Sequence, residues 1–221
     1  MLNLYVSKRR ILRGRTGPTI CKVSSTKSDE VPVLTEGKLE ADFCYHLEFD
    51  ENVLKYECQP LGFFYSLDSG DSTPNKKKPH YTPDFQVWYK DKSIRYFEVK
   101  QEKFIDPELE LLFPILQGQA VQLEKKLDFV LDSEIRAEPY FSNVKTLFKA
   151  KKNRTVNDSL LRNISALLIG NKNISAFDLI NKHNVIASIG DFYCLLANYK
   201  IKTDIKNFEL SWNMNLELNH E

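Results

Sequence analysis

One stretch, residues 81–100, constrains this chain more than any other because it combines a predicted β-hairpin with several ionisable side chains. Residues 85–89 are aromatic and β-branched, with alternate positions apolar, as in a half-buried strand. Residues 90–93 are polar and suit a turn. Residues 96–100 return as a second apolar strand. The sequence therefore predicts a hairpin that brings the start of its first strand beside the end of its second.

This hairpin gathers two acids and a lysine. Asp84 follows a Thr-Pro turn at the start of the first strand. Glu98 and Lys100 lie two residues apart on the second, so their side chains share a face. Neighbouring carboxylates raise one another's pKa unless a cation neutralises them, and Mg²⁺ prefers oxygen ligands. The three side chains therefore suit a metal site. The alternative is a purely structural role, since an acid and a lysine at this spacing also occur by chance on exposed strands.

Short blocks along the chain, in addition to this acid pair, indicate a known family. Their order, with the pattern LE, FD, QP, YTPD and EVK, resembles the TnsA family of the PD-(D/E)xK nuclease superfamily, the endonuclease subunits of heteromeric Tns-type transposons. Further similar blocks follow at residues 129–140, and the resemblance extends over residues 8–150. The blocks that carry the pattern are residues 39–43, 47–50, 56–60, 81–85 and 98–100.

The resemblance implies an active site and a reaction. The implied catalytic residues are Glu40, Asp84, Glu98 and Lys100; the implied metal ligands are Glu40, Asp84, Glu98 and the Val99 carbonyl. Glu48 competes with Glu40, which we prefer because it lies in the Leu-Glu block. The cofactor is Mg²⁺, or Mn²⁺ in its place. The implied reaction is cleavage of the 5′, non-transferred strands at transposon ends during cut-and-paste transposition, together with a TnsB-like DDE transposase and a TnsC-like ATPase.

The predicted fold class is α/β. Helices are expected over residues 39–49, 107–126 and 139–149, the second of them broken or bent near Pro114 and Gly118. Strands are expected over residues 53–59, 63–65 and 127–131 as well as in the hairpin. A helix between two strands suits a restriction-endonuclease-like mixed sheet with flanking helices. We expect this endonuclease domain to span residues 36–150.

Two basic segments are candidate DNA contacts. Residues 1–35 are expected to form a basic N-terminal arm, and residues 66–80 a turn-rich loop. Either segment is simply solvated, or it neutralises phosphates on double-stranded DNA. The candidate contacts are Arg9, Arg10, Arg13 and Arg15 in the arm, and Lys76, Lys77 and Lys78 in the loop.

A second domain is expected over residues 155–221, after a charged stretch at residues 149–154. One amphipathic helix ends at Gly170, and Ser175 and Ser188 are candidate N-caps for helices 176–183 and 189–198. Residues 208–218 alternate apolar and polar, which predicts a strand paired in a hairpin with residues 199–205. Three helices and a hairpin suit a winged helix. Because arginines are few, docking onto a partner protein is favoured over DNA reading, and the resemblance implies that this partner is the TnsC-like ATPase.

The cysteine spacing and the hydropathy of the chain limit where the protein can act. The four cysteines have no metal-like or disulfide-like spacing, which suits a cytoplasmic protein, and no apolar run is long enough to span a bilayer. Two rival functions stay open. One is a free-standing restriction or repair nuclease of the same superfamily, which would cut DNA without partners. The other is a catalytically inert module that bridges DNA and a partner protein.

Overall fold

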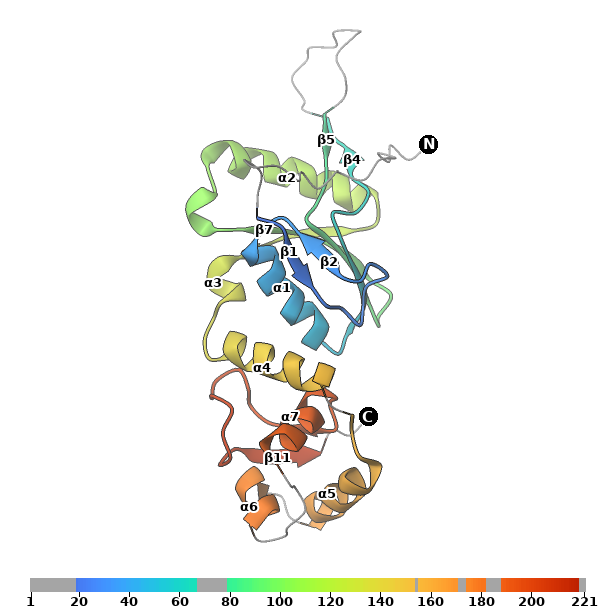
Figure 1. Cartoon of the computed structure of the whole chain (residues 1–221). Helices are drawn as coiled ribbons and strands as arrows, with labels where there is room; N and C mark the ends of the chain where they lie inside the picture. The colour runs from blue at the N-terminus through green and yellow to red at the C-terminus, as the bar shows by residue number, and fades with distance from the viewer. Residues whose placement is uncertain (1–18, 67–78, 154, 171–173, 182–187, 219–221) are drawn as a thin grey trace. The chain divides into compact units, whose positions relative to one another are not determined.

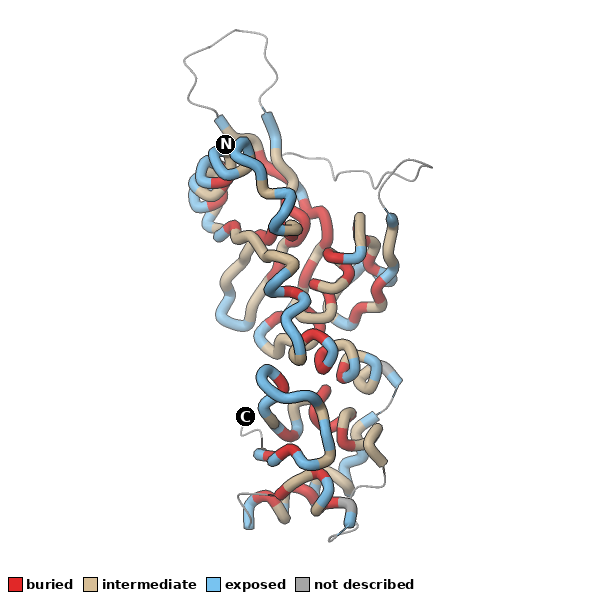
Figure 2. The backbone as a smooth tube through the Cα atoms, turned by 90° about the vertical axis from the view of Figure 1, so that its left-hand side faces the viewer, coloured by how far each residue is buried: buried red, intermediate tan, exposed pale blue. Residues whose placement is uncertain are grey.

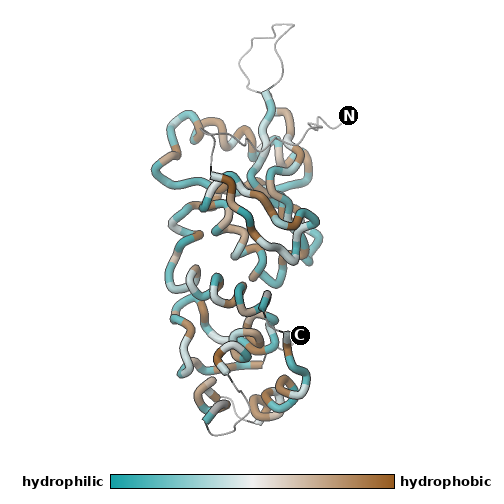
Figure 3. The backbone as a smooth tube through the Cα atoms, in the orientation of Figure 1, coloured by the Kyte–Doolittle hydropathy of each residue, from teal (hydrophilic) through white to brown (hydrophobic). Residues whose placement is uncertain are grey.

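The computed structural model describes residues 19–66, 79–153, 155–170, 174–181 and 188–218. The chain divides into two compact units, residues 1–135 and 136–221. This division lies upstream of the expected boundary at residues 149–154. The difference arises because residues 149–153 are the last turn of a helix in the second unit, α4 (Tyr140–Asn153), and not a linker. In Figure 3 both hydrophilic and hydrophobic parts occur along α4, whose start was expected as a helix over residues 139–149; only its charged last residues had suggested a connection.

The first unit is built on a four-stranded mixed sheet in the order β3-β6-β7-β8. The first three strands pair antiparallel, and β7 pairs with β8 in parallel across the connecting helix α2 (Pro107–Gln122). The expected hairpin is confirmed as β6 and β7, with a turn at residues 90–93. The four strands are β3 (Val53–Cys58), β6 (Phe85–Tyr89), β7 (Ile94–Lys100) and β8 (Lys126–Leu131).

Helices α1 (Lys38–Phe49) and α2 cover opposite faces of this sheet (Figure 1). The α1 face buries a cluster that includes Phe43, Phe85 and Val99. The α2 face buries a separate cluster that includes Tyr96 and Leu116. Figure 2 shows the buried residues concentrated along the strands between the two helices. Alternation along β7 thus assigns Tyr96, and with it Glu98 and Lys100, to the α2 face.

Helix α2 is continuous, contrary to the expected break. Its N-terminus is fixed by Asp106, whose side chain accepts a hydrogen bond from the Leu109 N–H at 2.8 Å, with Pro107 in the first turn. The helix then runs through Pro114 and Gly118 to Gln122. Pro114 lies inside the helix, where it lacks the N–H that would donate to the carbonyl four residues earlier, and the loss of this hydrogen bond does not end the helix.

The N-terminal region joins the fold earlier than expected. Strand β1 (Cys21–Val23) pairs antiparallel with β2 (Val33–Thr35), and Val23 and Val33 are buried in the α1 cluster. Residues 21–35 are therefore part of the first unit and not of a solvated arm; residues 1–18 lie outside the described residues. The smaller elements of this unit are β4 (Phe63–Phe64), β5 (His80–Tyr81), the 3₁₀ turn at Glu102–Phe104 and α3 (Asp132–Ile135).

The second unit contains four helices and a small antiparallel sheet in the order β10-β11-β9 within its described residues. Ser188 caps its helix as predicted, by accepting from the Asp191 N–H, and Ser175 accepts from the Asp178 N–H at 3.1 Å. Besides α4, the elements are α5 (Asp158–Gly170), β9 (Ile174–Ser175), α6 (Ala176–Asn181), α7 (Ile189–Ala197), β10 (Ile201–Lys202) and β11 (Asn215–Leu218).

The predicted strand over residues 208–218 is wrong for its first half. Only Asn215–Leu218 is a strand, paired with Ile201–Lys202, and residues 206–214 form a loop. The cause is Asn143, whose side-chain amide donates to the carbonyls of Ile205 and Phe208, each at 2.8 Å, and accepts from the Leu210 N–H at 3.0 Å. A side chain from α4 thus occupies the backbone groups that a strand would have paired.

Candidate active site

The hairpin register brings Asp84 and Glu98 together. Phe85 pairs with Phe97 across β6 and β7, so the next residue outward, Asp84, lies opposite Glu98. The Asp84 Oδ2 atom accepts a hydrogen bond of 2.8 Å from the Val99 N–H. This bond fixes the first acid to the backbone of the strand that carries the second. The expected juxtaposition of the two acids is therefore present in the structure.

Glu98 is held from two sides. Its Oε1 atom forms an ion pair of 2.7 Å with the Lys100 ammonium, and its Oε2 atom accepts a hydrogen bond from the Tyr81 hydroxyl. Tyr81 lies on β5, where it packs against the α2-side cluster. The sequence reasoning gave Tyr81 no role, because a tyrosine beside a Thr-Pro turn carries no signal of the side chain that its hydroxyl will contact.

The site is buried and carries a concentration of negative charge. Asp84 is 8% exposed and Glu98 is 6% exposed. Burial, followed by the charges of Glu98 and Glu40, raises the pKa of Asp84 well above its usual value, against the opposing effects of the Val99 N–H and Lys100. Burial alone would lower the pKa of Lys100, but the carboxylates of Glu98, Asp84 and Glu40 outweigh it and raise that pKa. Lys100 is thus held as a cation.

The structure separates the two candidate helix acids. Glu40 lies in the first turn of α1, where its Oε2 atom accepts from the Glu36 N–H at 2.9 Å, and its charge acts on both Asp84 and Lys100. Glu48 lies about two turns further along and is 1% exposed. Its carboxylate binds Ser25 and Thr26 instead. The geometry therefore favours Glu40 over Glu48 as a member of the site.

The donor set suits a partly hydrated magnesium ion. Within the described residues, no group of three or more His, Cys, Asp or Glu side chains is arranged to hold a metal. Asp84 and Glu98 nevertheless form a buried carboxylate pair with excess negative charge. Mg²⁺ commonly binds through one or two carboxylates and takes its other ligands from water and substrate phosphate. The residues present fit such an ion with Asp84 and Glu98 as its direct protein ligands.

The candidate DNA contacts cannot be placed beside this site. Arg9, Arg10, Arg13 and Arg15, and likewise Lys76, Lys77 and Lys78, lie outside the described residues.

None of the helices in the described part of the chain is both long enough and apolar enough to cross a membrane.

The mixed sheet of the first unit thus gathers Asp84, Glu98 and Lys100 at one end. A family model described as the TnsA-like endonuclease N-terminal domain matches residues 50–160, which is half of the 221-residue chain. The chain belongs to this family of TnsA-like endonucleases. Asp84, Glu98 and Lys100 lie inside the matched range, and Glu40 precedes it. No curated protein matches the chain. The family implies nuclease activity, a DNA substrate and, in general terms, partners of Tn7-type transposition.

Proposed function

We propose that the protein is a Mg²⁺-dependent DNA endonuclease that cuts the 5′, non-transferred strands at transposon ends. It acts with a TnsB-like DDE transposase and a TnsC-like ATPase. The observation that carries the proposal is the buried pair of Asp84 and Glu98, held by the Val99 N–H, the Tyr81 hydroxyl and Lys100. A buried acid pair in which the pKa of Asp84 is raised, beside a paired lysine, is typical of a functional site. The family match supplies the transposition context.

The protein's own residues prepare the site for phosphodiester hydrolysis. Asp84 and Glu98, with Glu40 and the Val99 carbonyl in support, would hold the metal. When bound, the metal supplies a water of lowered pKa and stabilises negative charge on the phosphate. Lys100 stays protonated because of its acidic neighbours, so its N–H groups can orient the attacking water and a phosphate oxygen. Tyr81 and the Val99 N–H keep both carboxylates in place, which preserves their geometry before DNA arrives.

A strand-cleavage assay tests this function. The substrate is duplex DNA that carries a transposon end, labelled on each strand, with Mg²⁺ or EDTA and with or without the transposase and ATPase. We expect cuts on the 5′ strands that need Mg²⁺ and both partners. Full activity of Asp84→Ala would remove the catalytic proposal. Cleavage of unrelated DNA without partners would favour a free-standing nuclease, and partner binding without any cleavage would favour an inert bridging module.

The basic segments are proposed to hold the DNA backbone. Each phosphate contact releases counterions, so replacing Arg9, Arg10, Arg13 and Arg15 by Gln should flatten the dependence of log affinity on log salt. The expected change is about 0.9 per lost contact on duplex DNA. The same measurement applies to Lys76, Lys77 and Lys78. An unchanged slope would mean that these residues are merely solvated.

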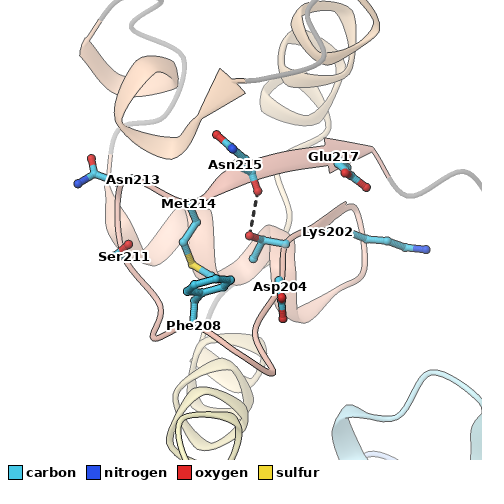
Figure 4. Close-up of a pocket in the computed structure, with 9 residues that line it drawn as sticks. Lys202, Asp204, Phe208, Ser211, Asn213, Met214, Asn215 and Glu217 are labelled. Carbon is cyan, nitrogen blue, oxygen red and sulfur yellow. Dashed lines mark hydrogen bonds between the residues drawn. The ribbon is translucent and has the colours of Figure 1, made fainter.

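The second unit is proposed to be a winged helix that docks onto the ATPase. Phe192, Leu195 and Leu196 of α7 do not supply its contact surface, because each of them is at most 4% exposed. A pocket of about 660 Å³ near β10 and β11 is a better candidate (Figure 4). Phe208, which is 63% exposed, and Met214 line it together with Lys202, Asp204 and Glu217. One base against two acids disfavours DNA phosphates and suits a partner segment with an apolar side chain beside basic residues.

A pull-down of the ATPase by the full chain tests the docking. Phe208→Ala should weaken capture at least five-fold, and Phe177→Ala is a matched control because it is 49% exposed but does not line the pocket. A cut after Arg154 is a poor test, since Asn143 on α4 binds the loop around Phe208 and would be separated from it. Equal capture by both variants would exclude this pocket. Tight binding of transposon-end DNA to this unit would make it a DNA reader.

A further inference from the structure

One buried side-chain amide in the first unit has no hydrogen-bond partner among the residues that the structure describes. Gln59 is 4% exposed, and neither its Nε2 nor its Oε1 atom has a partner among the described residues. Asn143 shows what a buried amide normally does, since it is also 4% exposed and uses both its nitrogen and its oxygen. Burying an unsatisfied amide is unfavourable, so such a group needs an explanation. A ligand that supplies the missing partners is one.

The backbone of Gln59 is attached directly to the proposed active site. Cys58, the last residue of β3, pairs with Phe85, so Gln59 follows at the position opposite Asp84. The Gln59 N–H donates a 2.7 Å hydrogen bond to the Asp84 carbonyl. Gln59 therefore lies at the same end of the sheet as Asp84 and Glu98.

The conformation of Gln59 is also unfavourable by itself. Its φ angle is 46°, in the left-handed region that residues with a side chain rarely adopt. Pro60 follows and disfavours the right-handed helical conformation at Gln59. The fold thus holds a strained backbone and an unsatisfied amide at one residue, next to a buried acid. Unfavourable local features that coincide in this way are expected at functional positions.

We propose that the Gln59 amide hydrogen-bonds the phosphate backbone of the DNA strand bound at Asp84, as a further substrate-contacting residue. The inference rests on the proposed function and adds a residue to it. A phosphate beside Asp84 and Glu98 meets two carboxylates, and Lys100 is already paired with Glu98 at 2.7 Å. A neutral amide donor can face this anion without adding charge to a buried site. Gln59 and Glu98 are buried to nearly the same degree, with exposed fractions of 4% and 6%.

The substitution Gln59→Met separates substrate contact from structure. Met has nearly the same length and volume but neither donates nor accepts strong hydrogen bonds. If the amide contacts DNA, the single-turnover cleavage rate should fall at least ten-fold while the Tm stays unchanged or rises, because an unsatisfied group has been removed. Affinity for the same duplex in Ca²⁺ should fall several-fold. Gln117→Met is the matched control: Gln117 donates to the Leu127 carbonyl at 3.0 Å, so its loss should lower the Tm and leave cleavage unchanged.

Three outcomes overturn the inference. Cleavage by Gln59→Met at the wild-type rate would show that the amide does not touch DNA. A rate and a Tm that fall together would give Gln59 a structural role only. If the wild-type chain cleaves no DNA, the proposed function fails separately, and an unchanged duplex affinity of Gln59→Met in Ca²⁺ then overturns this inference as well. A several-fold weaker affinity in that case would support the contact.

Discussion

Glu48 and Asp84 are both buried acids of the first unit, but their surroundings differ in kind. The Glu48 carboxylate accepts hydrogen bonds from the Thr26 N–H at 3.1 Å and the Thr26 hydroxyl at 2.8 Å, and another from the Ser25 hydroxyl. The Asp84 carboxylate accepts a hydrogen bond from the Val99 N–H and faces the charges of Glu98 and Glu40. One carboxylate is surrounded by donors, while the other is surrounded by further acids.

This difference means that Glu48 stabilises the fold, whereas the ionised form of Asp84 destabilises it. Donors around Glu48 tie the segment after β1 to the end of α1. The burial and the acidic neighbours of Asp84 oppose its ionisation, as its raised pKa shows. Such uncompensated charge is useful only where a cation or substrate arrives. Substitutions at the two places should therefore change stability in opposite directions.

The largest effect is expected from Asp84→Asn. Asn keeps an acceptor for the Val99 N–H but removes the charge, so cleavage should fall about a thousand-fold while the free energy of unfolding rises by about 1 kcal/mol. Single-turnover cleavage and urea denaturation in EDTA measure the two changes. Asp91→Asn is the control, because Asp91 lies in the exposed turn and accepts from Ser93. A loss of stability in Asp84→Asn would contradict the comparison.

The same charge predicts a pH dependence. The pKa of Asp84 is raised in the folded state, so between the usual value of 3.8 and that raised value the folded chain binds more protons than the unfolded chain. The contribution of Asp84 to stability therefore falls as pH rises through this window. The stability advantage of Asp84→Asn should accordingly be smaller at pH 4 than at pH 8. An advantage independent of pH would mean that Asp84 is not the source.

The second effect is the contrast between Glu40→Ala and Glu48→Ala in cleavage and in stability. Glu48→Ala leaves the buried Ser25 hydroxyl and the donors of Thr26 without an acceptor and should lower the free energy of unfolding by about 3 kcal/mol, with cleavage per folded molecule unchanged. Glu40→Ala should lower cleavage and change stability by less than about 1 kcal/mol, since Glu40 accepts from the Glu36 N–H at the helix start. The reverse pattern would place Glu48 in the site.

Sequence alone supplied the hairpin and its acid pair because both depend on local rules. Alternation fixed the strands, and the polar turn fixed the register that puts Asp84 opposite Glu98. The sequence could not decide between Glu40 and Glu48, because both lie on α1 and the choice depends on which residues each carboxylate contacts. The donors of Glu48 come from Ser25 and Thr26, more than twenty residues earlier.

Predictions failed where a distant side chain replaced a local pattern. The alternation in residues 208–214 is real, but Asn143 holds the backbone of that segment as a loop. The basic stretch at residues 149–153 suited a linker by composition, yet it completes α4. The role of the Tyr81 hydroxyl and the isolation of the Gln59 amide likewise depend on contacts across the fold. In each case tertiary structure outweighs local preference.

The third effect tests how Glu98 is held. Tyr81→Phe removes the hydroxyl that donates to Glu98 and should slow cleavage about ten-fold, in line with about 1.5 kcal/mol for a hydrogen bond to a charged group. Stability should change little, because the ring still packs in the α2-side cluster. Tyr96→Phe is the matched control: its hydroxyl binds the Lys125 ammonium at 2.6 Å, so its loss should spare cleavage. Equal slowing by both variants would point to packing and not to Glu98.

The smallest effect is expected from Lys27→Met, on the Glu48 side of the comparison. Its ammonium donates to the Leu47 carbonyl at 3.0 Å and to the Asp50 carbonyl, at the C-terminal end of α1. A cation there binds orphan carbonyls and complements the helix dipole, so its loss should lower the free energy of unfolding by about 1 kcal/mol. Lys22→Met is the control, because Lys22 is exposed on β1.

Lys27 also sharpens the assignment of the basic N-terminal residues. Because its ammonium is used inside the fold, Lys27→Met should leave the salt dependence of DNA binding unchanged, unlike replacement of Arg9, Arg10, Arg13 and Arg15. Urea denaturation and DNA titrations at several salt concentrations measure the two properties on the same variants. A flatter salt slope in Lys27→Met, with no loss of stability, would indicate that Lys27 contacts DNA and does not stabilise the fold.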